Sequence, residues 1–459
     1  MATKTHSAVP PTAYFEAFTA LQRRMSDEPA WLRIRRQEAF DSFCDRGFPT
    51  LKDEDWRFTN TASIARLPYH LPTDAEARLS SKDVQSFLIR KAACHLVFVN
   101  GRFAPELSAC GTLHPGVKAG SLATEMQCRT ASIALHLDRY HNQKHDAFSN
   151  LNAAFWEDGA YIHIARGAIL KAPIHILNLS VETKEPVMVH SRNLLIADAD
   201  TQADIVEEYA SLSSGVVFFN TMTEIAAGEN AVLSHCLIER QSRNAFQVST
   251  LSLHQARNAN VSAHSVLTGG ALVRNNVHLV LDGAGAVCLI NGLFIGDDGQ
   301  HLDNYMFVEH ASPYCESKQF YNGILGANAR GVFHGRILVH KDAQKTNAKQ
   351  TNRNLLLSDD AQIDTKPQLE IYANDVKCTH GATIGQVDES SLFYLRSRGL
   401  DEGEARALLL YGFAGECLER IKSEVVRERA ECVVRQSLPD AVPLSVTASA
   451  GDRRWEEVG

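Results

Sequence analysis

The chain has 459 residues, of which 44% are hydrophobic and 22% charged, with a formal net charge of −8 and a pI of about 6.2. This composition is ordinary for a globular protein, and the acidic balance argues against binding to nucleic acid or to an anionic membrane surface. The sequence contains no run of 18 apolar residues, so we expect no transmembrane helix.

We expect residues 1–158 to form a mostly helical region that includes a short hairpin. Tyr14, Phe18 and Leu21 recur at helical spacing. Residues 96–103 read LVFVNGRF, which places Asn-Gly at the turn of a hairpin. The first residues lack the apolar segment of a secretory signal, so we expect a cytoplasmic protein.

Ten cysteines are scattered along the chain, and none forms a CxxC pair. A disulfide framework is not expected in a large chain without an export signal, so the sequence predicts reduced thiols. We expect Cys236, Cys288 and Cys315 to be residues of the core or of its stacked coils.

From residue 159 to residue 385 short apolar runs alternate with turns rich in Gly, Asn, Asp and Ala. These runs are too short and too evenly spaced for strand–helix–strand units. One coil of a parallel β-helix has a comparable length, but a β-sandwich also contains many short strands, so the pattern alone leaves both folds open. Branched residues recur at steps of 26 to 45 residues, at Ile169, Ile205, Val232, Val261, Val287, Val332 and Ile363.

Residues 386–438 change to a helical pattern. Asp388 is a candidate N-cap, Gly399 suits the position after a helix, and Asp401 with Glu404 resembles a capping box. A broad apolar stripe with small residues in it continues this helical pattern, at Ala405, Leu408, Leu409, Gly412, Phe413, Leu418 and Ile421. We expect residues 439–459, beyond the helical region, to be a disordered tail.

The string KCTHGAT at residues 377–383 holds the most informative chemistry. Cys378 and His380 are two residues apart, so in a β-strand their side chains share one face. Thiolate and imidazole both bind iron, but two ligands do not complete a four-ligand site. Further ligands would have to come from another segment or another protein. The alternative is that one or both residues point into the core, as free cysteines often do.

Other residues give weaker signals. His301, His310, His334 and His340 fit outward-facing polar positions of stacked coils as well as they fit ligands. The phosphate-binding pattern GxxxxGK[ST] is absent, as are HExxH, the serine elbow and the EF-hand loop. We therefore expect no ATP hydrolysis by this chain.

Residues 342–400 resemble the signature of the SufB/SufD family of iron–sulfur cluster assembly scaffolds. They contain DAQKTNAKQTNRNLLLS, then KPQLEIYANDVKCTHGATIGQ, then LFYLRSRGL. The resemblance extends upstream through residues 301–305 and 317–323. EDWRFT at residues 54–59 is similar to the SufD branch. The likeness covers most of residues 50–425 and is dense in the last third.

This resemblance implies a mainly β fold, in which a right-handed parallel β-helix is flanked by an N-terminal α/β region and a C-terminal helical region. It implies a non-catalytic, SufD-like subunit that pairs with SufB through the β-helix. The ATPase SufC would bind the C-terminal helical domain (386–438). We take the apolar positions of that domain as the contact: Leu408, Leu409, Gly412 and Phe413.

The family's functional histidine falls on His380, which would hold iron transiently and share it with the partner. Cys378 matches a neighbouring family cysteine. The resemblance implies a transient iron–sulfur cluster at the partner interface and no permanently bound cofactor. Sulfur would arrive indirectly from a cysteine desulfurase and its sulfur carrier. The resemblance is also compatible with a homodimer, in which the isolated chain would pair with itself through the surface that it offers to SufB.

Two other functions compete with this interpretation. A β-helix enzyme acting on polysaccharide is one, but such enzymes are usually exported and use clustered carboxylates or bound calcium. A SufB-like subunit that holds a cluster alone is the other, but residues 54–59 and the absence of clustered cysteines argue against it.

Overall fold

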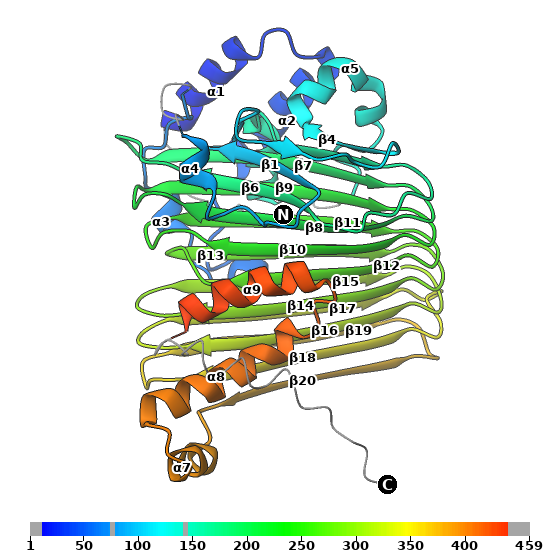
Figure 1. Ribbon diagram of the computed structural model, residues 1–459. Helices are drawn as coiled ribbons and strands as arrows, with labels where there is room; N and C mark the ends of the chain where they lie inside the picture. The colour runs from blue at the N-terminus through cyan, green and yellow to red at the C-terminus, as the bar shows by residue number, and fades with distance from the viewer. Residues whose placement is uncertain (1–11, 74–78, 141–145, 439–459) are drawn as a thin grey trace.

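The computed structural model describes residues 12–73, 79–140 and 146–438, and its centre is a solenoid of parallel strands. Two sheets run along the solenoid, with β20 at one end and helices α1 and α5 beyond the other (Figure 1). Within the described residues, no helix is long and apolar enough to span a bilayer. The tail predicted at 439–459 lies outside the described residues.

Each coil contributes one strand to each sheet. The first sheet contains β1 (Cys94–Val99), β2 (Arg102–Phe103), β3 (Ala109–Cys110), β6 (Ile174–Ser180), β8 (Gln202–Ser211), β10 (Val232–Arg240), β12 (Asn260–Leu267), β14 (Val287–Gly296), β16 (Glu316–Leu325), β18 (Asn347–Leu356) and β20 (Lys377–Gly385). The second contains β4 (Val117–Ser121), β5 (Ala160–Ile164), β7 (Val187–Ala197), β9 (Val217–Ala227), β11 (Phe246–Gln255), β13 (Leu272–Leu281), β15 (His301–His310), β17 (Arg330–Val339) and β19 (Gln362–Ile371).

Neighbouring coils pair in parallel, which confirms the predicted β-helix and excludes the sandwich. Val232 lies opposite Asn260, and Asn260 lies opposite Val287. The repeat positions read from the sequence mixed the two sheets, because Val332 and Ile363 belong to β17 and β19 of the second sheet. This mixing explains part of the irregularity of the steps.

One corner of the solenoid is built from a stack of residues with left-handed backbone. Asp200, Asn230 and Asn258 have φ values of 61°, 59° and 56°, a conformation that Asn and Asp tolerate better than other non-glycine residues. The Asn230 Nδ2 donates to Asp200 Oδ1 at 2.8 Å, and the Asn258 Nδ2 donates to Asn230 Oδ1 at 3.3 Å. These side chains link successive coils.

The interior of the solenoid is an apolar core, and helices cover parts of both outer faces. Strands covered on both sides are apolar at successive positions, which hides the strict alternation expected of a half-exposed strand. The N-terminal helical elements are α1 (Thr12–Arg24), α2 (Ala30–Arg46), η1 (Glu54–Trp56), α3 (Ala62–Ala65), α4 (Ser81–Val84), α5 (Leu122–Ala134) and α6 (Ala147–Phe155).

The EDWRFT segment docks on the outer face of the second sheet. Thr59 Oγ1 donates to Asp303 Oδ2 at 2.5 Å, across 244 positions of sequence. The guanidinium of Arg274 lies 3.9 Å from the centre of the Trp56 ring and forms an ion pair with Asp303. The segment therefore joins the N-terminal region to coils formed much later in the chain.

The predicted hairpin is present. β1 and β2 pair antiparallel, and Asn100 and Gly101 at the turn have φ values of 44° and 78°, as a tight hairpin turn requires. β1 also pairs in parallel with β6, so it continues the first sheet of the solenoid beyond the start expected at residue 159.

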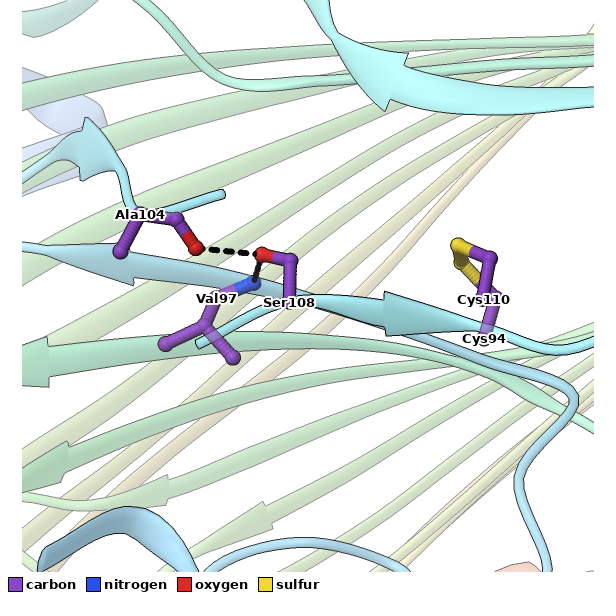
Figure 2. Close-up of a disulfide and its surroundings, with 5 residues drawn as sticks. All are labelled: Cys94, Val97, Ala104, Ser108 and Cys110. Atoms are coloured by element: carbon purple, nitrogen blue, oxygen red, sulfur yellow. Dashed lines mark hydrogen bonds between the residues drawn. A yellow bond between two sulfur atoms is a disulfide. The ribbon is translucent and has the colours of Figure 1, made fainter. Parts of the chain in front are cut away.

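One cysteine pair corrects the prediction that all thiols are reduced. Cys94 on β1 lies directly opposite Cys110 on the antiparallel β3, and the two form a disulfide (Figure 2). Ser108 supports the same loop, because its Oγ accepts from Val97 N at 3.0 Å and donates to Ala104 O at 2.8 Å. The pairing arises from strand register, which a separation of 16 residues does not reveal.

The C-terminal region forms α7 (Glu389–Ser397), α8 (Glu402–Leu418) and α9 (Glu424–Ser437). The predicted caps are confirmed: Asp388 accepts from Ser391 N, and Asp401 with Glu404 forms a capping box. Gly399 has a φ of 96°, which favours glycine at this position. Helices α8 and α9 lie across the outer face of the first sheet (Figure 1).

Candidate functional site

The KCTHGAT string lies on β20, the terminal strand of the first sheet. Among the described strands, β20 pairs only with β18, so its other edge is open. Cys378 is half-buried and packs against the interior core, whereas His380 is exposed. Because positions i and i+2 share a face, His380 lies on the same inward side of β20 as Cys378, at the open end of the solenoid.

The inward-facing residues next to His380 on the neighbouring strands are polar. Gln350 on β18 lies opposite His380, and Gln319 on β16 lies opposite Gln350. Both glutamines are buried, and Gln350 Nε2 donates to Gln319 Oε1 at 2.7 Å. Asn352 and Asn354 are buried on the same strand and hydrogen-bond each other at 2.6 Å. The interior therefore becomes more polar as it approaches His380.

Gly335 on β17 makes room for these glutamines. A Cβ atom at this position would lie 1.8 Å from Gln350 Nε2 and 2.9 Å from Gln319 Oε1. The amide of Gln350 therefore reaches across the interior as far as the second sheet. This arrangement was not predicted from the sequence, although the alternating polar residues of KQTNRN on β18 are its signal.

The chemistry of the pair depends on what covers it. Burial raises the pKa of the Cys378 thiol, so the isolated chain holds it as a neutral thiol with little nucleophilic character. No group of three or more His, Cys, Asp or Glu within the described residues could hold a metal ion. A metal or cluster at Cys378 and His380 would need ligands from outside these residues.

The other candidate histidines lie apart from β20 and each has a polar partner. His301 contacts Thr59 at 2.8 Å, and His310 contacts Ser317 at 2.8 Å. His334 contacts Gln368 at 2.8 Å, and His340 contacts Glu309 at 2.6 Å. The structure does not bring these four side chains together with Cys378 and His380.

The three cysteines expected in the core are buried. Cys288 and Cys315 belong to the interior core, and Cys236 packs in the cluster under α8 and α9. Burial raises the pKa of all three thiols, that of Cys236 to about 12.

The apolar positions predicted to contact the ATPase have two different environments. Phe413 packs against the outer face of the first sheet, with the guanidinium of Arg353 5.3 Å from its ring centre, and Gly412 is exposed. Leu408 and Leu409 instead line a groove between α7 and α8. The groove residues are Ser390, Ser391, Tyr394, Leu395, Leu408 and Leu409.

Aromatic side chains on α7 are unusually exposed. Phe393 is 75% exposed and Tyr394 is 56% exposed, and Tyr394 lines the groove. Large exposed aromatic residues beside a groove are typical of a protein interaction surface. We call the six groove residues with Phe393 the α7–α8 surface.

Comparison with known proteins gives consistent matches along the chain. A family model described as "SUF system FeS cluster assembly, SufBD core domain" matches residues 179–413, and one described as "SufBD protein N-terminal region" matches residues 11–176. An iron–sulfur cluster assembly SufBD family protein of Synechocystis is 34% identical, over 88% of this chain and 91% of its own length.

Two further relatives carry the name iron–sulfur cluster assembly protein SufD. The Escherichia coli protein is 29% identical, over 88% of this chain and 92% of its own length. The Bacillus subtilis protein is 24% identical, over 90% of this chain and 95% of its own length.

Proposed function

Because the chain belongs to the SufBD family of iron–sulfur cluster assembly proteins, we propose that it is the SufD-like subunit of a cluster assembly scaffold. The observation that carries this proposal is the exposed His380 beside Cys378 on the terminal strand of the solenoid. In this role the chain positions ligands and partners and is not itself a catalyst. The cluster is its cargo.

The open end of the solenoid is the surface proposed to pair with a SufB-like paralogue. β20 ends the first sheet and β19 ends the second, so both present strand edges without a described partner. Unpaired edges bind further strands readily. A partner that continued both sheets would cover His380 and Cys378 and place its own ligands beside them.

At such an interface His380 would supply a neutral ring nitrogen to iron, and Cys378 a sulfur ligand or an auxiliary thiol. Both donor types suit iron. The partner would complete the ligand set, which explains how two donors on this chain are enough. Sulfur would reach the interface from a cysteine desulfurase through its sulfur carrier.

The α7–α8 surface is the proposed docking site for a SufC-like ATPase. Its exposed aromatic residues and its groove support this assignment. ATP hydrolysis would belong to that partner, and movement of the ATPase would be transmitted through α8 to the first sheet, on which α8 packs.

The test of this function is His380→Ala in the complex co-expressed with the complete pathway. Removal of the donor should leave the yield of complex unchanged and lower iron and acid-labile sulfide by about tenfold or more, since even partners of metal ligands typically contribute 10- to 100-fold. Cys378→Ser should give a milder loss.

His340→Ala is the matched control, because His340 is a partly exposed histidine of the same solenoid that pairs with Glu309. Its iron and sulfide content should equal that of the wild type. Wild-type content in the His380→Ala complex, or failure of that complex to assemble, would overturn the assignment of His380.

A further inference from the structure

Gln350 carries an unused hydrogen-bond acceptor next to His380. Its Nε2 is committed to Gln319 Oε1 at 2.7 Å, whereas its Oε1 is buried and has no partner among the described residues. Nε2 bonds Gln319 of the preceding coil and lies beside Gly335 of the second sheet. The next coil contributes β20 to the same sheet as Gln350, and there His380 occupies the position opposite Gln350.

The opposite wall of the interior offers few competing donors at this level. Gly335 has no side chain, and its neighbour in the last coil is Pro367, which has neither a polar side chain nor a backbone N–H. Thr365 on β19 carries a hydroxyl that has no partner among the described residues. Gln319 Nε2 on the preceding coil is also without a described partner, but on the open side of Gln350 the residue opposite it is His380, and no described residue hydrogen-bonds the His380 ring.

We propose that Gln350 is a positioning residue for His380: when a partner covers the open end, one ring N–H of His380 donates to Gln350 Oε1. The other ring nitrogen then keeps its lone pair and faces the partner. A carbonyl oxygen can only accept a hydrogen bond, so it selects the imidazole tautomer whose proton lies on the nitrogen that faces it. Partners of metal-ligating histidines generally act in the same way. This inference rests on the proposed role of His380 in cluster assembly.

The physical reason is the cost of burial. In the isolated chain water can hydrogen-bond the exposed His380 ring, but a partner at the open end would exclude that water. A donor and an acceptor buried side by side without pairing are both destabilising. Pairing removes both costs and fixes the orientation of the ring at the moment the interface forms.

The test compares three variants of the complex formed with the SufB-like and SufC-like partners. Gln350→Met removes the acceptor at similar volume, whereas Gln350→Glu keeps an acceptor that Gln319 Nε2, itself unpartnered, can also bond. Thr365→Val removes the competing hydroxyl and is the control. Iron and sulfide content are measured together with the nitrogen-15 spectrum of histidine-labelled complex, in which the His380 signals are identified by their loss in His380→Ala.

We expect a single His380 tautomer in the wild type, in Gln350→Glu and in Thr365→Val, with cluster content near that of the wild type. Gln350→Met should show mixed tautomers and about a tenfold lower cluster content at unchanged complex yield. Wild-type content with a single tautomer in Gln350→Met would overturn the inference, and so would equal losses in Gln350→Met and Thr365→Val. If His380→Ala keeps full content, the proposed function fails instead.

Discussion

Buried carboxyl groups of the first sheet show how partners decide ionisation at the scale of one residue. Glu208 on β8 and Glu239 on β10 are both fully buried. Burial acts to raise the pKa of each, but the His175 ring 3.3 Å away and hydrogen bonds from Arg429 outweigh it at Glu208 and lower that pKa. Within the described part of the chain, Glu239 is hydrogen-bonded only by the backbone N–H groups of Gln241 and Gly269, and its pKa is raised to about 7.

Glu239 should make the protein less stable as pH rises. Its folded pKa of about 7 exceeds the unfolded value of about 4.3. Between these values the folded state holds a proton that the unfolded state has lost, so stability declines with rising pH by up to about 4 kcal/mol. Glu239→Gln removes this titration.

Thermal unfolding at pH 5, 6, 7 and 8 measures the effect. The decline in Tm across this range should be smaller in Glu239→Gln than in the wild type. Glu229→Gln is the control, since Glu229 lies on an exposed turn and pairs with Arg257. An unchanged pH slope in Glu239→Gln would contradict the prediction.

At the scale of one element, α8 divides its apolar stripe between two neighbours. Leu410, Ala414 and Cys417 are buried against the first sheet, whereas Leu408 faces the groove beside α7. The sequence pattern predicts an apolar helix but not this division, because helical periodicity records burial and not the identity of the partner. Deleting α7, α8 and α9 together would also expose the outer face of the first sheet. A point substitution in the groove therefore tests docking of the ATPase more specifically.

Leu408→Glu should abolish co-purification of a SufC-like ATPase, because a carboxylate in the groove would lose its water on docking. The circular dichroism and Tm of the isolated variant should match the wild type. Leu135→Glu is the control, at an exposed leucine that directly follows α5, which lies at the opposite end of the solenoid from α8 (Figure 1). Full retention of the ATPase by Leu408→Glu would place docking elsewhere.

At the scale of the molecule, the C-terminal helices are tied to an early coil of the solenoid. Arg429 on α9 donates to Glu208 Oε1 at 2.5 Å across 221 positions of sequence, and also to Phe87 O at 3.1 Å. Arg240 bonds the same carboxylate at 2.7 Å. This buried ion cluster fixes α9 to the first sheet.

Arg429→Met should lower the free energy of unfolding by about 2 to 3 kcal/mol. Breaking a buried ion pair typically costs about 3 to 5 kcal/mol, and Glu208 retains Arg240. Arg427→Met, on the same helix, should change it by about 1 kcal/mol or less, since Arg427 makes a partly exposed contact with Glu431 at 3.8 Å and one hydrogen bond to Ile421 O at 3.2 Å. Denaturant unfolding measures the free energy of unfolding of both variants. Similar losses in the two would contradict the stabilising role assigned to the ion cluster of Arg429 and Glu208.

The hairpin and the helix caps could be predicted from the sequence, because each depends on local turn or capping chemistry. The pattern of short strands left a β-helix and a β-sandwich open, and only the resemblance to the SufB/SufD family favoured the β-helix. Cys378 and His380 could be placed on one strand face by spacing alone. The acceptor of Gln350, the disulfide between Cys94 and Cys110 and the docking of residues 54–59 could not be predicted. Each depends on register between segments that are distant in sequence, which a local pattern does not record.

The docking of residues 54–59 has a consequence for synthesis. Thr59 reaches its partner Asp303 only after 244 further positions have been translated. At about 5–20 residues per second this takes roughly 10 to 50 seconds. During that interval Trp56 has no Arg274 and Asp303 beneath it, although the first coils can already stack. The segment can stack on Phe148 of α6 before then, but its hydrogen bond to Asp303 and its contact with Arg274 form only after the middle coils have left the ribosome.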